Sequence, residues 1–208
     1  MLRWMIGFLI LAASLCASPP PQKSVPKDLI VLDPGHGGFD EGANVKGLLE
    51  KALALKTATL VKQQLHQKGY RVILTRSRDV FISLEKRSSI ANETKCKLFV
   101  SFHYNAFKKP EVSGIEIYYC PKGPKGKQNQ SKKLATLVLE GLIATTGSKN
   151  RGVKTGNFHV IRETKMPAIL IEGGFMTNPQ EHAHLTDQNY IEKMACSIAH
   201  AIEQFLVL

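Results

Sequence analysis

Residues 29–38 read LIVLDPGHGG, and they carry the clearest signal of the fold. Its first four residues form a short apolar run, which is typical of a strand buried within a sheet. The run passes directly into a turn rich in proline and glycine that carries His36. Parallel sheets place their functional residues in such turns, at the carboxyl ends of their strands. We therefore expect a parallel sheet with a functional histidine at its carboxyl edge.

Helical and strand-like segments alternate through the rest of the chain, joined by short connections. The expected helices cover residues 50–68, 84–95, 131–145, 179–185 and 191–205, and the expected strands cover 29–32, 70–75, 98–102, 114–119, 158–161 and 168–171. Residues 121–130 are rich in Pro, Gly and Lys and are expected to form a loop. Alternation of this kind implies a parallel sheet with right-handed crossovers. We predict an α/β fold: a single domain with a mostly parallel, twisted sheet flanked by helices on both faces.

Four ionisable side chains stand where strands end or helices begin. His36, His103 and Glu172 each follow an expected strand, so parallel strands would place them on one rim of the sheet. Glu50 opens the first helix after a glycine-rich loop and can fold back toward His36. The helix dipole also favours an acidic residue at that position.

Two imidazoles and one carboxylate are a donor set of catalytic zinc sites, which leave a fourth coordination position for water. Zinc lowers the pKa of that water and polarises a carbonyl group. A nearby free carboxylate can take the proton of the water and pass it to a leaving amine. The residues therefore predict metal-assisted amide hydrolysis without an organic cofactor. They leave open whether Glu172 is a fourth ligand or the acid–base group.

Other functional motifs are absent. Asp40 stands where a dinucleotide-binding GxGxxG loop requires its last glycine. No GxxxxGK[ST] phosphate loop, HExxH zinc motif or GxSxG nucleophile elbow occurs.

The chain carries a formal net charge of +11, which favours anionic partners. The basic residues are not interleaved with aromatic residues in the manner of RNA-binding surfaces, so we expect no nucleic acid partner. Two explanations stay open: a solvated basic face, or attraction to an anionic envelope surface.

The first 18 residues predict an export signal. Arg3 precedes an apolar run at residues 4–15, and small residues follow it. The run is short for a transmembrane span, although an uncleaved anchor is the alternative. Lipid modification of Cys16 is disfavoured, because Leu15 precedes it where a small residue is usual.

We divide the chain into an export signal at 1–18, a Pro-rich linker at 19–27 and a catalytic domain at 28–208. The domain contains three cysteines, Cys96, Cys120 and Cys196, so at most one disulfide can form within it.

Several segments resemble the zinc-dependent N-acetylmuramoyl-L-alanine amidases, the catalytic domain of the bacterial cell-separation amidases. The resemblance spans about residues 29–207, in the order of that family. The matching segments are IVLDPGHGGFDEGA, GLLEKALAL, VILTRSRDVFISLEKRSSIAN, LFVSFHYNA, SGIEIYY and RGVKTGNFHVIRETKMPAILIEGGFMTNPQE.

The resemblance implies that His36, Glu50 and His103 bind one Zn²⁺ ion. It implies that Glu172 is the catalytic acid–base and not a fourth ligand. The family cleaves the amide between N-acetylmuramic acid and L-alanine in peptidoglycan, during cell-wall remodelling and daughter-cell separation. We expect a periplasmic or secreted monomer whose partner is the glycan strand with its stem peptide.

Three further residues lie in the matched segments and are expected to contact substrate: Asn105, Arg76 and Arg162. Arginine suits a carboxylate, and a stem peptide has carboxylates. Structural ion pairing is the alternative for the arginines, and bracing of the loop is the alternative for Asn105. Asp33 and Asp40 are expected in turns or beside the ligands.

The sequence departs from the family pattern at Ala52, at Leu53–Ala54 and at Gly173, and none of these changes removes a ligand. Residues 113–158 are short compared with relatives that carry a blocking helix there, so we expect an open site.

Two other functions stay open. A zinc carboxypeptidase acting on another bond of the stem peptide would use the same metal set. A wall-binding protein without catalysis is the second alternative, and the intact Glu172 argues against it.

Overall fold

A computed structural model describes residues 27–208 of the chain. This part contains eight strands and six helices: β1 (Lys27–Pro34), β2 (Asn44–Val45), β3 (Leu48–Leu49), α1 (Glu50–Gln67), β4 (Tyr70–Leu74), α2 (Leu84–Thr94), β5 (Leu98–Asn105), β6 (Ile115–Tyr119), α3 (Lys125–Thr146), β7 (Asn150–Thr155), α4 (His159–Arg162), β8 (Ala168–Phe175), α5 (Pro179–Thr186) and α6 (Gln188–Val207).

Six strands form one sheet in the order β4-β1-β5-β8-β6-β7, while β2 and β3 form a separate hairpin. Strands β4, β1, β5 and β8 pair in parallel. Strand β6 is antiparallel to β8, and β7 is parallel to β6. The sheet is therefore mostly parallel, as predicted, with its β6–β7 edge reversed.

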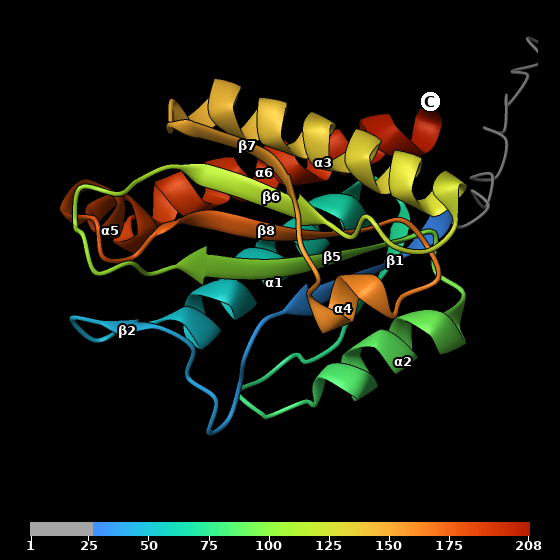
Figure 1. Cartoon of the computed structure of the whole chain (residues 1–208), viewed down its shortest axis with the longest axis horizontal. Helices are drawn as coiled ribbons and strands as arrows, with labels where there is room; N and C mark the ends of the chain where they lie inside the picture. The colour runs from blue at the N-terminus through green and yellow to red at the C-terminus, as the bar shows by residue number, and fades with distance from the viewer. Residues whose placement is uncertain (1–26) are drawn as a thin grey trace, which may run out of the picture.

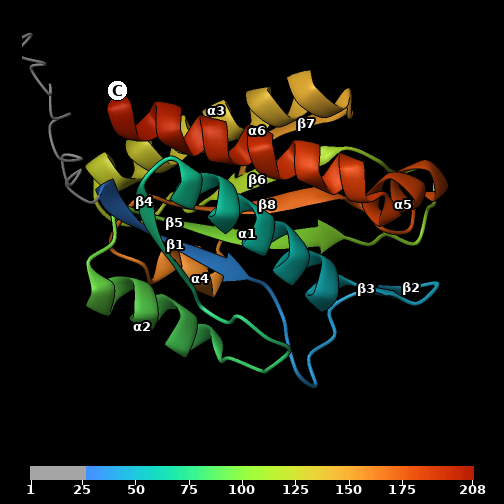
Figure 2. The ribbon, with the colours of Figure 1, turned by 180° about the vertical axis from the view of Figure 1, so that it is seen from behind.

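Helices cover both faces of the sheet, as the sequence predicted. Helices α1, α3 and α6 pack on one face, while α2 and α4 pack on the other (Figures 1 and 2). Strand β1, which lies between β4 and β5, is buried on both sides, because its Ile30, Val31 and Leu32 have no exposed surface. Residues that alternate along β1 enter two separate apolar clusters, one beneath each layer of helices.

Two predicted segments differ from the structure. Residues 158–161 were expected to be a strand, but α4 occupies them, and the strand of this region is β7 at Asn150–Thr155. Strand β7 lies at the sheet edge and contains Arg, Gly and Lys, so it lacks the apolar run of a buried strand. The expected loop at 121–130 is also partly wrong, because α3 begins at Lys125, directly after Pro124.

The expected export signal lies outside the described residues, as does the linker apart from Lys27, which begins β1. Within residues 27–208, no helix combines the length and the apolar character that crossing a membrane requires. The three cysteines of this part are unpaired: Cys96 and Cys120 are buried and Cys196 is exposed.

Lys127 makes a buried contact in the first turn of α3. Its side chain is buried, and Nζ donates to the carbonyl oxygens of Ile161, Arg162 and Thr164 at the end of α4. The ammonium group thus donates to backbone carbonyls at the end of α4 and just beyond it. This contact ties the first turn of α3 to α4.

We expect Lys127→Met to lower the free energy of unfolding by about 1–3 kcal/mol, because it removes a charged donor from buried carbonyls. Urea denaturation would measure the change. Lys133→Met, at an exposed position on the same helix, is the matched control and should change stability by less than about 0.5 kcal/mol. Equal effects of the two substitutions would show that the buried contact contributes nothing.

Candidate metal centre

His36 lies in the turn after β1, in an unusual backbone conformation. Its φ angle is 57°, in the left-handed region that residues with a Cβ atom rarely adopt. Arg87 holds the turn in place, since its Nη2 donates to the carbonyl of His36 at 2.6 Å and its Nη1 donates to that of Pro34 at 2.6 Å. The ring is therefore aimed by contacts made to the backbone beneath it.

His103 and Glu172 lie on neighbouring parallel strands. They are paired in register across β5 and β8, so their side chains project from the same face of the sheet. Glu50 is the first residue of α1, and the chain returns it to the sheet through the β2–β3 hairpin. The sequence rule that placed these groups on one rim is confirmed by this arrangement.

His36, Glu50 and His103 converge on one point. Glu50 Oε1 lies 3.0 Å from His36 Nε2 and 3.0 Å from His103 Nδ1. One ligand atom from each residue lies within 4.8 Å of the others. We call these three residues the His–Glu–His group. Two imidazole nitrogens and a carboxylate oxygen so placed could hold a metal ion.

Surrounding contacts fix the orientation of these side chains. His36 Nδ1 lies 2.8 Å from Asp40 Oδ1, and the backbone N–H of Ala43 donates to Glu50 Oε2 at 2.9 Å. The backbone N–H of Tyr104 donates to Glu50 Oε1 at 3.1 Å. Such outer contacts are typical of metal sites, where they set the ring tautomer and the direction of the carboxylate. Asp40 thus occupies the position beside the ligands that the sequence suggested.

Glu50 and His36 shift each other's pKa values toward their charged forms. Burial raises the pKa of Glu50, but hydrogen bonds and positive charge from His103 and His36 outweigh burial and hold that pKa well below its usual range. Burial lowers the pKa of His36, yet hydrogen bonds and negative charge from Glu50 and then Asp40 raise it overall. Glu50 is therefore an anion at neutral pH, as a metal ligand must be.

Glu172 has a different environment. Its Oε2 atom is buried and has no hydrogen-bond partner among the described residues. Burial, followed by the negative charges of Glu50 and Glu116, raises the pKa of Glu172 to about 8. Buried polar atoms without partners are rare and often mark functional groups.

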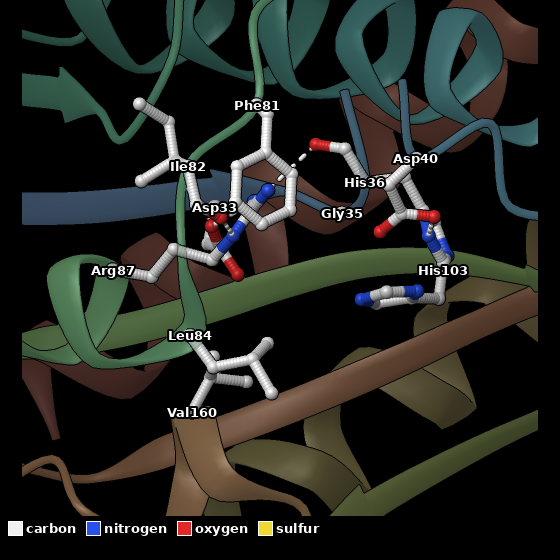
Figure 3. A pocket seen from close by; sticks show the side chains of 10 residues that line it. All are labelled: Asp33, Gly35, His36, Asp40, Phe81, Ile82, Leu84, Arg87, His103 and Val160. Carbon is white, nitrogen blue, oxygen red and sulfur yellow. Dashed lines mark hydrogen bonds and ion pairs between the residues drawn. The ribbon is translucent and has the colours of Figure 1, made fainter. Parts of the chain in front are cut away.

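A pocket of about 410 Å³ opens beside His36 and His103 (Figure 3). Phe81, Ile82 and Leu84 line its far side, from the end of the loop after β4 and the start of α2. Phe81 also stacks against the exposed ring of Phe39, with centroids 4.2 Å apart. The His–Glu–His group is thus bordered on this side by an apolar wall.

The three expected substrate contacts have different surroundings. Arg76 is 3 % exposed and donates to four backbone carbonyls, including Pro34 and Gly35, which argues against substrate contact. Asn105 donates to Glu116 Oε1 at 3.0 Å, which fits the bracing alternative. Arg162 ends α4, where it contacts Asn157 and Glu163. No described contact joins Arg162 to the His–Glu–His group.

Glu116 is the centre of a polar cluster on β6 and β7 that local sequence patterns did not predict. Glu116 accepts hydrogen bonds from Asn105, Tyr118, Arg151 and Lys154. Glu116 is paired in register with Glu172 across β6 and β8. Because that pairing is antiparallel, the rule that functional groups follow strands could not have found Glu116, which lies near the start of its strand.

Comparison with known proteins identifies relatives over almost the whole described part. A family described as N-acetylmuramoyl-L-alanine amidase matches residues 30–204. The N-acetylmuramoyl-L-alanine amidase LytC of Bacillus subtilis is 39% identical over 171 residues, which are 82% of this chain and 34% of LytC. This chain therefore spans about a third of that relative's length.

Two further relatives align with this chain over most of the length of both proteins. The uncharacterized protein YqiI of Bacillus subtilis is 32% identical over 94% of this chain and 93% of its own length. The crystal structure of an N-acetylmuramoyl-L-alanine amidase from Clostridium difficile 630 superposes with a TM-score of 0.82 at 35% identity. That match covers 88% of this chain and 98% of the other.

Gly35 provides a test of the site geometry. A Cβ atom at this position would lie 2.3 Å from Cε1 of His103. We expect Gly35→Ala to push the ring out of the His–Glu–His group and to weaken binding of a divalent metal at least tenfold, because a ligand is misplaced. Calorimetric titration of the metal-stripped protein with zinc would measure the change.

Gly126→Ala is the control for this substitution, because a Cβ atom there meets no atom within 4 Å. It should leave zinc affinity unchanged. Unaltered affinity in Gly35→Ala would show that the metal does not bind at His103.

Proposed function

Because the chain belongs to the N-acetylmuramoyl-L-alanine amidase family, we propose that it is a zinc hydrolase of peptidoglycan. It cleaves the amide between N-acetylmuramic acid and L-alanine, for cell-wall remodelling and daughter-cell separation. The convergence of His36, Glu50 and His103 beside a partnerless Glu172 supports this proposal most directly.

His36 Nε2, Glu50 Oε1 and His103 Nδ1 would hold the zinc ion. The donor set fits zinc, which takes imidazole and carboxylate ligands and keeps an open position in catalytic sites. When bound, zinc supplies a Lewis acid that polarises the amide carbonyl and makes water easier to deprotonate. Asp40 keeps the ring of His36 in the required orientation.

Glu172 would move the protons. Its carboxylate accepts a proton from the attacking water and returns it to the nitrogen of the leaving L-alanine. Burial, Glu50 and Glu116 raise the pKa of Glu172 to about 8. The positive charge of bound zinc would lower that pKa again, toward the range that a proton carrier needs near neutral pH. Its Oε2 atom is free of protein partners in the described part of the chain, so it is available to water or substrate.

We also propose that the enzyme acts outside the cytoplasm, after export directed by residues 1–18, and as a monomer. The sequence of this segment supports export, since Arg3 precedes an apolar run of signal length. The mass of the mature protein, recovered from the cell envelope or medium, tests whether the signal is cleaved.

The proposed bond is tested by mass spectrometry of purified peptidoglycan after digestion. We expect free stem peptides with an L-alanine amino terminus and glycan strands without peptide. A chelator should abolish these products and added zinc should restore them, because the mechanism needs the metal. Release of D-alanine instead would identify a carboxypeptidase, and an unchanged polymer in the presence of zinc would indicate a binding protein.

Glu172→Gln separates catalysis from metal binding. We expect normal zinc content and a loss of about 10²- to 10⁴-fold in kcat/KM, because the proton carrier is removed while its shape is kept. Glu140→Gln, at an exposed position on α3, is the control and should retain full activity. A Glu172→Gln enzyme of normal rate contradicts the assigned role.

A further inference from the structure

A row of ionisable side chains begins at His103 of the His–Glu–His group and extends across the sheet toward β7. His103 on β5, Glu172 on β8 and Glu116 on β6 are paired in register, so they project from the same face. Neighbouring strands are about 4.8 Å apart, which places Glu116 about 10 Å from His103 along this row. The next strand, β7, contributes Arg151 and Lys154.

One carboxylate oxygen of Glu116 accepts hydrogen bonds from two cationic side chains. Its Oε2 accepts from Arg151 Nε at 2.8 Å and from Lys154 Nζ at 2.5 Å, while its Oε1 accepts from Asn105 and Tyr118. Burial raises the pKa of Glu116, but the hydrogen bonds from Lys154, Arg151 and Tyr118 outweigh it and lower that pKa to about 2. Glu116 is therefore charged at neutral pH and holds both cations in place.

The cluster keeps an excess of positive charge at an accessible position. One carboxylate faces two cations, and the side chains of Lys154 and Arg151 are 37% and 26% exposed. An ammonium group has three N–H donors, of which the hydrogen bond to Glu116 uses one.

Among the described residues, the opposite side of the His–Glu–His group carries an apolar wall and no exposed cation from its pocket. Its pocket is lined by Phe81, Ile82 and Leu84. The cation of that pocket, Arg87, is buried and already bonded to Asp33 and to backbone carbonyls. Exposed positive charge near the row thus lies toward β7, on the far side of Glu172.

We propose that Lys154, together with Arg151, binds a free carboxylate of the stem peptide and so directs the peptide half of the substrate across β8 and β6. This inference rests on the proposed function. Both cations bond to Glu116, which lies about two strand spacings, or about 10 Å, from His103. About three extended residues beyond the scissile amide span that distance, at about 3.4 Å per residue. A carboxylate there gains charge-assisted hydrogen bonds from the two cations.

The test compares two peptides that begin with L-alanine and differ at the third residue, which carries either a free carboxylate or a carboxamide. Calorimetric titration of the zinc-loaded protein measures their binding directly. We expect the carboxylate peptide to bind at least tenfold more tightly, because only it can use the two cations. Lys154→Met should remove most of this preference and leave the affinity for the carboxamide peptide unchanged.

Two control variants test whether the effect comes from the charge at this position. Lys154→Arg keeps the charge and should retain the preference, whereas Lys122→Met removes an equal charge from an exposed loop and should have no effect. Equal affinity of the wild type for the two peptides, or an unchanged preference in Lys154→Met, overturns the proposal.

Binding and cleavage separate this inference from the proposed function. A chain that cleaves the muramoyl amide but ignores the carboxylate refutes only the subsite. A chain that prefers the carboxylate peptide but releases no peptide from peptidoglycan refutes only the assigned reaction.

Discussion

The buried ion pair between Asp33 and Arg87 holds together the part of the molecule on which the site depends. Asp33 accepts hydrogen bonds from Thr75, Ser101 and Arg87, and so connects β1 with the end of β4, with β5 and with α2. Arg87 then donates to the backbone of the turn that carries His36. Removing either partner would leave an uncompensated buried charge, which is far more costly than replacing the pair as a whole.

This network explains how a metal-binding turn can adopt a strained conformation. A residue other than glycine in the left-handed region costs about 1–2 kcal/mol, and His36 adopts that conformation. The guanidinium groups of Arg76 and Arg87 donate to the carbonyls of residues 34–36, which over-determines the turn. The strain is offset by charge-assisted hydrogen bonds, and the ring of His36 is presented toward Glu50.

Strand β6 runs antiparallel to β8, and this reversal of direction makes one side of the site cationic while the other side is apolar. Parallel strands alone would supply only the groups that follow their carboxyl ends, such as His103 and Glu172. Because β6 runs the other way, the start of that strand reaches the same rim and adds Glu116, with the cations of β7 behind it. The apolar pocket beside α2 and the cationic cluster on β7 therefore flank the same His–Glu–His group.

Local sequence rules were sufficient to predict the α/β alternation and the rim on which His36, Glu50, His103 and Glu172 meet. His103 and Glu172 lie in the carboxyl-terminal halves of β5 and β8, His36 lies in the turn after β1, and Glu50 begins α1, so the position of each depends on the chain immediately around it. The family resemblance then suggested roles that the residue types alone left open for Glu172.

Other features of the fold and the site depend on long-range contacts that local sequence patterns do not contain. The direction of β6, the existence of β7 as an edge strand and the helical turn of α4 depend on pairing and packing between segments far apart in the chain. Whether an arginine contacts substrate or backbone depends on its burial, which the tertiary environment sets and which separates the buried Arg76 from the partly exposed Arg151. The cationic cluster was invisible in the sequence for the same reason, since Glu116, Arg151 and Lys154 meet only when β6 and β7 pair beside β8.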